Sequence, residues 1–317
     1  MFNIKPLQEN QYNWWNNFVD NSNGGTIFHR LDFLEYHGNK YKNNENHLVI
    51  YKGDSPIGIL PLIITDNIAK SPYGGSYGGP IFKTNLDYKE SNEIIETILN
   101  YLINIEVNTF IITLPIAQCY KVYSDTFRFC LLENNFKYSN RDISSIVLID
   151  KDKTISDQIT SRARNMVRKA TNLGVNIIEK GSISDFWKVL NLTYQKHGVN
   201  PTHSFDQFQY LYGKLPGKIY VDVAYYKNIP ISGIGYFVIN NLGNSSFYFA
   251  QDPEFQNMQA LSLLIYNGLE KSKQINDLWF DFGTSTSNMK GKVEIFNFKE
   301  SFNSIGSFRD TFKWEKL

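Results

Sequence analysis

One lysine inside an aromatic segment has the surroundings most suited to chemistry in this chain. Lys299 lies within Phe-Asn-Phe-Lys-Glu-Ser-Phe, which spans residues 296–302. Burying a lysine there is costly unless its charge meets a partner, and Glu300 and Asp281 are the candidates. A buried ammonium group could stabilise the oxyanion that forms when a nucleophile attacks an acyl group. The alternative is a lysine whose stem lies on the aromatic rings while its charge stays in water.

The residues before this lysine are typical of the floor of a cleft. An apolar strand ends at Asp281, Gly283 follows shortly after it, and the next side chains carry hydroxyl groups, beginning with Thr284 and Ser285. Glycine lets a ligand approach the backbone closely, and loops held by a rigid sheet are where binding residues gather. We therefore expect Thr284 and Ser285 to bind substrate close to Lys299.

Three other motifs lack the context that their chemistry requires. Residues 74–78 match G-x-S-x-G, but no strand precedes them and no helix follows, which argues against a serine hydrolase. Residues 281–283 match the metal-binding tripeptide of kinases, without the glycine-rich loop and catalytic loop of that family. The five histidines show no H-E-x-x-H spacing, so we expect no bound metal.

A basic helix is predicted over residues 154–175. Thr154 and Asp157 form a capping signal, and Gly174 is a natural stop. At 100° per residue, Arg162 and Lys169 lie at the edge of the apolar stripe and could meet a phosphate or carboxylate. The alternative, which base rates favour, is a basic face exposed to water.

Composition limits the classes of function that are open to the chain. Its 32 basic and 31 acidic residues give a net charge of +1, so it lacks the overall field that non-specific nucleic-acid binding needs. Two cysteines in no metal or redox spacing predict a reducing compartment, and hence a cytoplasmic protein. No signal peptide is recognisable, and the longest apolar run, residues 57–64, is shorter than the roughly 20 residues of a membrane span.

The order of predicted elements in the second half of the chain repeats that in the first. Each half contains a pair of strands, then a helix, then a buried strand: 47–64, 90–105 and 110–114 in the first half, and 219–239, 259–271 and 278–282 in the second. A chain of 317 residues is also long for one compact unit. Together these features predict a duplicated unit and two domains.

Motifs in both halves resemble those of the FemAB-like acyltransferases of the GNAT superfamily. The segment 164–170 matches R-N-x-x-R-K-A and is followed by Gly-Val at 174–175. The resemblance continues through further segments, in the second half at 201–204, 281–283 and 298–302, and in the first half at 26–29, 59–62 and 76–80. These segments span nearly the whole chain, and their order is more specific than any one of them.

The resemblance implies an α+β fold with two tandem GNAT-like domains, each a mixed sheet flanked by helices. The domains are expected at 1–150 and 151–317, with the last residues packing on the first domain and a cleft between domains for the acceptor. Lys299 stands where this family has a lysine that stabilises the tetrahedral intermediate. Asn303 and Ser304 replace the glycine that usually follows the motif.

The donor that the resemblance implies is either acyl-CoA or aminoacyl-tRNA. Similar proteins transfer an amino acid from aminoacyl-tRNA to a peptidoglycan precursor, or an acyl group to an amino sugar of a surface polysaccharide. Residues 254–260 lack the glycines with which acetyl-CoA-dependent members bind pyrophosphate. The long helical arm that some tRNA-using members insert is also absent from the sequence. The choice of donor therefore stays open.

Taken together, residues and resemblance predict a bacterial N-acyltransferase that acts on an amine of a cell-envelope precursor. The acceptor is expected to be a small molecule, either a nucleotide amino sugar or a peptidoglycan precursor, with tRNA as a further partner if it is the donor. No permanently bound cofactor is expected. The alternative is a catalytically silent module that binds a saccharide or peptidoglycan fragment.

Each candidate residue has a role in this hypothesis. Lys299 stabilises the oxyanion, and His203 or Asp281 takes the proton from the amine. The remaining candidates bind substrate: Thr284 and Ser285 near the oxyanion, Tyr73, Tyr77, His37 and Phe298 elsewhere in the cleft, and Arg162 and Lys169 at a diphosphate.

Overall fold

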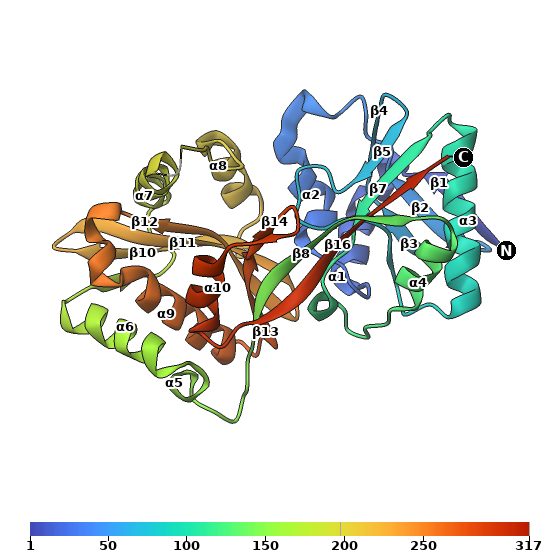
Figure 1. Cartoon of the computed structure of the whole chain (residues 1–317). Helices are drawn as coiled ribbons and strands as arrows, with labels where there is room; N and C mark the ends of the chain where they lie inside the picture. Colours follow the sequence, from blue (N-terminus) through green and yellow to red (C-terminus); the bar gives the residue numbers. More distant parts are fainter. Residues whose placement is uncertain (197, 317) are drawn as a thin grey trace. The chain divides into compact units, whose positions relative to one another are not determined.

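The computed structural model describes residues 1–196 and 198–316, which fold into two units (Figure 1). Unit 1 comprises Met1–Ile143, Asn288–Lys290 and Phe308–Leu317, and unit 2 comprises Ser144–Ser287 and Gly291–Ser307. The sequence predicted a boundary at residue 150, whereas the units change at 143/144, inside strand β8 (Lys137–Leu148).

Unit 1 contains both antiparallel and parallel strand pairs. One sheet has the order β1-β2-β3-β6, with β1 at Phe2–Pro6, β2 at Leu48–Lys52, β3 at Ser55–Leu60 and β6 at Ile81–Phe82. The other strands follow the order β4-β5-β7-β16-β8, with β4 at Ile63–Thr65, β5 at Ile68–Ser71, β7 at Thr109–Thr113 and β16 at Ile305–Glu315. Strands β5 and β7 are parallel, so the strands of the unit run in mixed directions.

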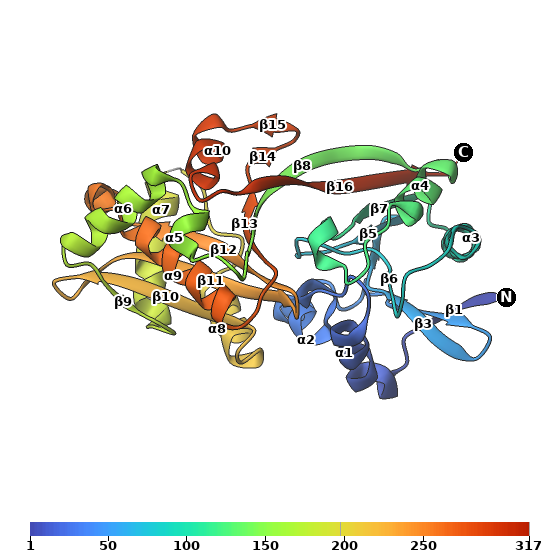
Figure 2. The same ribbon diagram turned by 90° about the horizontal axis from the view of Figure 1, so that it is seen from below.

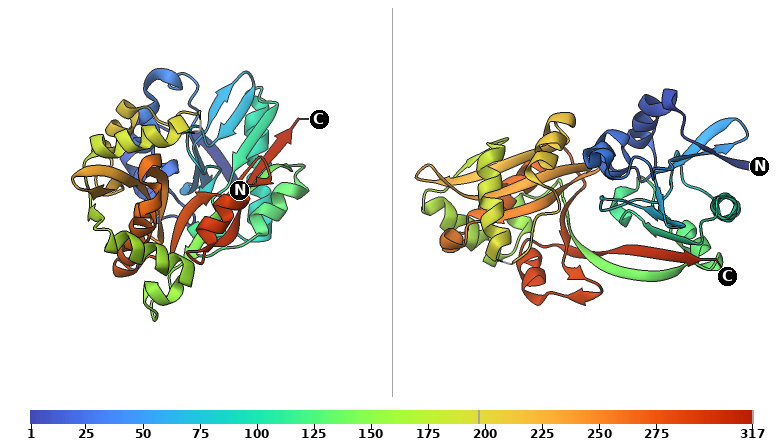
Figure 3. Two further views of the ribbon diagram at one scale, coloured as in Figure 1. Left: turned by 60° about the vertical axis from the view of Figure 1, so that its left-hand side comes forward. Right: turned by 90° about the horizontal axis from the view of Figure 1, so that it is seen from above.

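Helices of unit 1 pack against these strands through apolar faces. They are α1 (Tyr12–Asn21), α2 (Leu31–Leu34), α3 (Tyr88–Asn104) and α4 (Thr126–Glu133), with short 3₁₀ helices at Glu9–Gln11, Ile27–His29, Glu35–Lys40 and Ala117–Cys119. The main chain at Glu90 donates to the Asp87 side chain at 2.8 Å, which caps α3. The sequence has five apolar residues at helical spacing in this segment; Ile94, Ile95, Ile98 and Leu102 are buried in the core of the unit, whereas Ile105, just past the end of α3, is exposed. Figure 3 shows α3 beside the strands.

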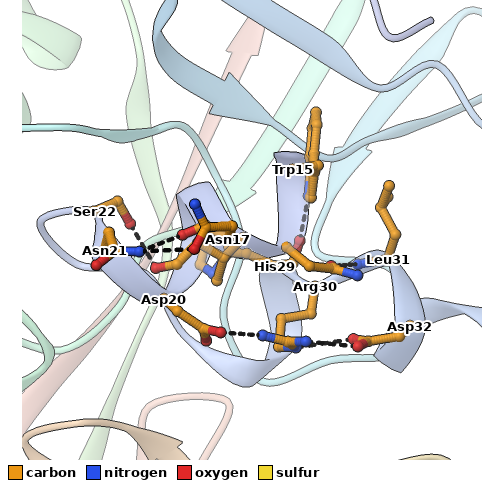
Figure 4. Close-up of polar contacts among 11 residues, drawn as sticks. Trp15, Asn17, Asp20, Asn21, Ser22, His29, Arg30, Leu31 and Asp32 are labelled. Atoms are coloured by element: carbon orange, nitrogen blue, oxygen red, sulfur yellow. Dashed lines mark hydrogen bonds and ion pairs between the residues drawn. The ribbon is translucent and has the colours of Figure 1, made fainter. Parts of the chain in front are cut away.

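Polar contacts fix the segment between α1 and α2 (Figure 4). Arg30 pairs with Asp20 at 2.5 Å and with Asp32 at 2.6 Å. The indole N–H of Trp15 donates to the backbone carbonyl of His29 at 2.8 Å. The ring of His29 is fully buried in the unit, and its Nδ1 lies 2.8 Å from the Thr26 hydroxyl.

Unit 2 contains a mixed sheet. Its strand order is β8-β13-β12-β11-β10-β9, with β9 at Asn176–Ile178, β10 at Ile219–Tyr226, β11 at Ile229–Asn240, β12 at Gly243–Gln251 and β13 at Trp279–Thr284. Strands β12 and β13 are parallel, and the other neighbouring strands run antiparallel. The predicted α+β class with mixed sheets is confirmed.

Helices cover both faces of the unit 2 sheet. They are α5 (Ile155–Gln158), α6 (Ser161–Asn172), α7 (Ile183–Lys196), α8 (Phe205–Lys214), α9 (Ala260–Gln274) and α10 (Val293–Glu300), with a 3₁₀ helix at Pro253–Met258. Figure 1 shows α6 and α9 on one face of the sheet and α7 and α8 on the other. The short strands β14 (Thr286–Ser287) and β15 (Lys290–Gly291) lead into α10 (Figure 2).

The prediction of a single helix over residues 154–175 was wrong in one respect, because this segment forms two helices, α5 and α6. Ile159 between them is extended, with φ −96° and ψ 160°. Thr160 then caps the second helix by accepting from the main-chain N–H of Ala163, and its hydroxyl donates to the carbonyl of Ser301 at 2.7 Å. A threonine can end one helix and begin the next, since its side chain competes with the backbone for hydrogen bonds.

None of the helices in the described part of the chain combines the length and the apolar character needed to cross a bilayer.

The start of β12 is a position where only glycine fits. A Cβ on Gly243 would lie 2.3 Å from the Trp279 ring and 2.6 Å from the Trp279 carbonyl oxygen. We expect Gly243→Ala to lower the free energy of unfolding by about 2–3 kcal/mol, because the ring and the backbone must both move. Gly213 in α8 is the matched control, since a Cβ there meets nothing within 4 Å, and Gly213→Ala should stabilise the protein by about 0.5–1 kcal/mol. Urea unfolding of both variants checks this, and an unchanged Gly243→Ala protein would contradict it.

Candidate active site

Unit 2 contains a pocket of about 1000 Å³, which opens where β12 and β13 cease to pair. The two strands form a parallel ladder at Gly243/Trp279, Asn244/Phe280 and Ser245/Asp281, and within the described residues that ladder extends no further. The later halves of both strands line the pocket, together with residues of α6, the end of α7, the start of α9 and α10. The unpaired part of the sheet thus provides room for a ligand.

Lys299 is the buried cation of this pocket. It lies in the last turn of α10 with 5% of its surface exposed. Its Nζ donates to the carbonyl oxygens of Gly283 and Thr284, each at 2.8 Å. An ammonium group has three N–H donors, so two carbonyls leave one donor for a ligand. The hydrogen-bond partners of Lys299 are thus backbone atoms, while Asp281, one of the two carboxylates that the sequence suggested, acts on it through its charge.

The environment of Lys299 makes its proton labile near neutral pH. Burial lowers the pKa of the Lys299 ammonium to about 8, and the nearby Asp281 carboxylate acts in the opposite direction. A lysine with its pKa at this value is still mostly charged at pH 7. It can therefore donate a hydrogen bond to a developing oxyanion.

Asp281 shapes the turn that carries the two carbonyls. Its Oδ1 accepts the main-chain N–H of Gly283 at 2.7 Å, and its side chain is buried. Gly283 has φ +71°, a left-handed conformation that glycine adopts without strain. The main-chain carbonyl of Asp281 also accepts from the Ser246 hydroxyl at 3.2 Å. Asp281 thus lies behind the residues that line the pocket.

The two hydroxyl residues predicted beside Lys299 occupy different positions. Thr284 lines the pocket. Ser285 is buried, and its hydroxyl shares a 2.6 Å hydrogen bond with that of Ser145. Among the residues that the structure describes, Ser285 is not part of the pocket wall.

His203, at the start of α8, is enclosed by aromatic rings. Its Nδ1 lies 2.7 Å from the Tyr248 hydroxyl, which also accepts the His203 main-chain N–H at 3.1 Å. Its ring packs against Phe237 and Phe247. Phe247 lines the pocket, so His203 lies one side chain away from it. In the described part of the chain, no group of three or more His, Cys, Asp or Glu side chains is arranged to hold a metal.

Arg162 and Lys169 project from α6 at the surface. Arg162 lines the pocket and also borders a shallow groove of about 460 Å³, in which Lys169 takes part. Both side chains are exposed, and neither pairs with a carboxylate among the described residues. Arg162 and Lys299 therefore line the same pocket, whereas Lys169 lines the adjoining groove.

The three other predicted binding residues lie in unit 1. Tyr73 is buried and donates to Glu45 at 3.0 Å, and burial raises the pKa of its hydroxyl. The Nε2 of His37 lies 3.1 Å from the Tyr73 carbonyl oxygen. Tyr77 is buried, with the Arg309 guanidinium 5.5 Å from its ring. Their roles in binding substrate stay predictions.

Several residues of the pocket were missed by sequence reasoning. Phe298 was expected, but the apolar wall also includes Phe247, Phe249, Phe282, Met166 and Leu261, and the charged residues at the opening include Lys196, Lys292 and Glu294. Phe247 and Phe249 are two residues apart on β12, and this spacing was a usable signal, because alternate residues share one face of a strand. No sequence pattern shows where two strands separate.

Comparison with known proteins identifies the fold. No family model and no curated protein matches the sequence. Solved structures match over almost the full length. FemX has a TM-score of 0.73 at 12% identity, covering 98% of this chain and 97% of that chain. L-PGS from Bacillus licheniformis has a TM-score of 0.61 at 10% identity, covering 98% and 92%.

A third match supplies the name of the architecture. The tandem GNAT protein from the clavulanic acid biosynthesis pathway has a TM-score of 0.58 at 10% identity, covering 99% of this chain and 98% of that chain. Likeness at such low identity concerns the arrangement of the backbone. The chain therefore has the tandem GNAT-like fold of FemX and the clavulanic acid pathway protein, as its motifs predicted.

Proposed function

We propose that the chain is an N-acyltransferase that moves an acyl or aminoacyl group onto an amine of a cell-envelope precursor, either a nucleotide amino sugar or a peptidoglycan precursor. The observation that supports this most directly is the ammonium group of Lys299 in the unit 2 pocket, held by two backbone carbonyls. A pre-oriented cation shielded from water is suited to a developing oxyanion. The motif resemblance and the fold support the same reaction class.

In the proposed reaction, a neutral amine attacks the acyl carbon of an ester or thioester. The carbonyl oxygen becomes negatively charged and accepts a hydrogen bond from Lys299. The intermediate then collapses, the bond to the leaving alcohol or thiol breaks, and an amide remains. Asp281 and His203 stay the candidates for accepting the proton of the amine. Both are buried behind the pocket wall, so the proton would pass through an intervening group.

Charges at the opening of the pocket favour a phosphorylated donor. Arg162, Lys196 and Lys292 line it on the exposed side, against one carboxylate, Glu294. Acyl-CoA and aminoacyl-tRNA both carry several phosphates, and a cluster of cations attracts either of them. The pocket therefore fits an anionic carrier without distinguishing between the two.

The direct test of the proposed function is formation of an amide. The protein is incubated with acetyl-CoA, longer acyl-CoA thioesters or charged tRNA, together with a nucleotide amino sugar or a peptidoglycan precursor, and products are identified by mass spectrometry. An amide that forms with the parent protein and not with Lys299→Met supports the proposal. Stoichiometric binding of an acceptor with no product from any donor would favour the silent binding module.

The pH dependence of transfer should follow the charge of Lys299. Since the pKa of this group is lowered to about 8, the ammonium is present below pH 8 and is lost as the pH rises above it. We expect the rate of the chemical step, divided by the fraction of the acceptor amine that is neutral, to fall about tenfold per pH unit above pH 8. Single-turnover rates between pH 6 and pH 10, with the acceptor amine titrated separately, check this. A corrected rate that stays constant to pH 10 would remove the ammonium of Lys299 from the mechanism.

A further inference from the structure

The inner wall of the unit 2 pocket is apolar, whereas its opening is charged. Phe282 is 3% exposed, and Phe249 and Phe298 are half-buried, as are Met166 and Leu261. The charged residues that line the pocket near solvent are all exposed: Arg162, Lys196, Lys292 and Glu294. The pocket therefore separates an anionic part of a ligand from an apolar part.

The apolar wall adjoins the ammonium group of Lys299 from two directions. Phe298 precedes Lys299 on α10, and Phe282 precedes Gly283, whose carbonyl oxygen accepts from Lys299 at 2.8 Å. Ring centroids of Phe249 and Phe282 lie 6.1 Å apart, and Phe302 links Phe282 to Phe298 with centroid distances of 6.1 and 5.7 Å. A carbonyl bound to Lys299 thus lies in the same pocket as these aromatic rings.

Polar side chains in the buried part of the pocket are already engaged with the protein. The hydroxyl of Ser246 donates to the Asp281 carbonyl, and that of Ser262 is directed at Gln259 and the Met166 sulfur. Among the described residues that line the pocket, Glu294 is the one carboxylate, and it is exposed. A charged acyl side chain would lose its hydration there without gaining a partner.

We propose that the transferred acyl group is bulky and apolar, either a medium-length aliphatic chain or an aromatic group. Its chain packs against Phe249, Phe282 and Phe298 while its carbonyl oxygen meets Lys299. This inference rests on the proposed function and specifies its substrate class. A small acyl group would leave the exposed parts of Phe249 and Phe298 in water, whereas an apolar chain would cover them and remove its own apolar surface from water.

Binding is tested first, with neutral amides that need no carrier. Acetamide, butanamide, hexanamide and phenylacetamide are titrated into the full-length protein, and the dissociation constants are measured by NMR. We expect affinity to rise about fourfold for each added methylene, and phenylacetamide to bind at least as tightly as hexanamide. Acetamide that binds as tightly as hexanamide, or no measurable binding of hexanamide and phenylacetamide, would overturn the inference.

Two variants of Phe249 test whether the dependence of affinity on chain length arises at the apolar wall of the unit 2 pocket. Phe249→Ser should reduce the dependence on chain length, and Phe249→Trp, which narrows the pocket, should weaken hexanamide more than acetamide. Phe249→Trp keeps the test valid if the serine variant does not fold. Phe129→Ser is the matched control, because Phe129 is an exposed residue of α4 in unit 1, and it should leave the chain-length dependence unchanged. A dependence that survives both Phe249 variants would contradict the assignment.

Transfer assays separate this inference from the proposed function. With one carrier held constant, hexanoyl or phenylacetyl transfer should exceed acetyl transfer in kcat/KM by at least tenfold. Faster transfer of acetyl or glycyl groups would overturn the inference and leave the proposed function standing. Binding that depends on chain length, without transfer from any donor, would support the apolar site and count against the proposed function.

Discussion

Lys299→Met is expected to lower the turnover number of acyl transfer by about 100- to 1000-fold, which is the usual cost of removing one donor to an oxyanion. Methionine keeps the length of the side chain and removes the charge and all three N–H donors. The free energy of unfolding should change little, because two effects oppose each other. The loss of the hydrogen bonds to the carbonyls of Gly283 and Thr284 lowers the stability of the variant. The absence of a buried ammonium group raises it.

The measurement is single-turnover kinetics of the parent and the variant at pH 7, with the thermal unfolding midpoint recorded for both. Lys151→Met is the control, because Lys151 is an exposed lysine of unit 2 outside the pocket, and it should retain parental activity. Full activity of a folded Lys299→Met protein would exclude Lys299 from the chemical step. A KM effect with an unchanged turnover number would instead assign Lys299 to ground-state binding.

Unit 1 is expected to lose stability as the pH falls from 6.5 to 4, because two buried histidines are held neutral. Burial lowers the pKa of both His29 and His47 from 6.5 to about 4. Between these values the unfolded chain binds a proton at each histidine and the folded chain does not. Their contribution to stability is therefore complete above pH 6.5 and is lost toward pH 4. Each shift corresponds to about 3 kcal/mol, a large part of the 5–15 kcal/mol of a typical domain.

Urea unfolding at pH 7 and pH 4.5, followed by tryptophan fluorescence, measures this loss. Carboxylates also titrate in acid, so the double variant His29→Gln, His47→Gln isolates the histidines. The free energy of unfolding of this double variant should differ less between pH 7 and pH 4.5 than that of the parent. His37→Gln is the control, because the His37 ring is only half-buried. It should reduce the pH-dependent change in the free energy of unfolding less than the double variant does. A double variant with the parental pH dependence would contradict the assignment.

The strand in the floor of the pocket could be predicted from sequence, whereas its end and the contacts of Lys299 could not. A run of apolar residues predicted a strand that ends at Asp281, but β13 continues to Thr284, with Gly283 in a left-handed conformation inside it. The partners of Lys299 are the carbonyls of Gly283 and Thr284. Every residue has a carbonyl, so no residue type marks these two acceptors in advance.

The position of a tyrosine is a second property that sequence reasoning does not give. Tyr73 and Tyr77 were expected to bind substrate; the structure buries both rings in unit 1, and their role in binding stays a prediction. The residue type alone does not distinguish a tyrosine in a core from one in a pocket, because in both places the apolar ring is buried and the hydroxyl needs a hydrogen-bond partner. Here Glu45 supplies that partner for Tyr73.

The strand β16 has a consequence for how the protein is made. Thr311 to Glu315 pair with β7, and Phe312 and Trp314 are buried in the core of unit 1. The ribosome synthesises this strand long after β7. Until then, part of the apolar core of unit 1 is exposed to water. An N-terminal fragment that ends near residue 143 would lack that strand, and aggregation during synthesis is the hazard that such a gap creates.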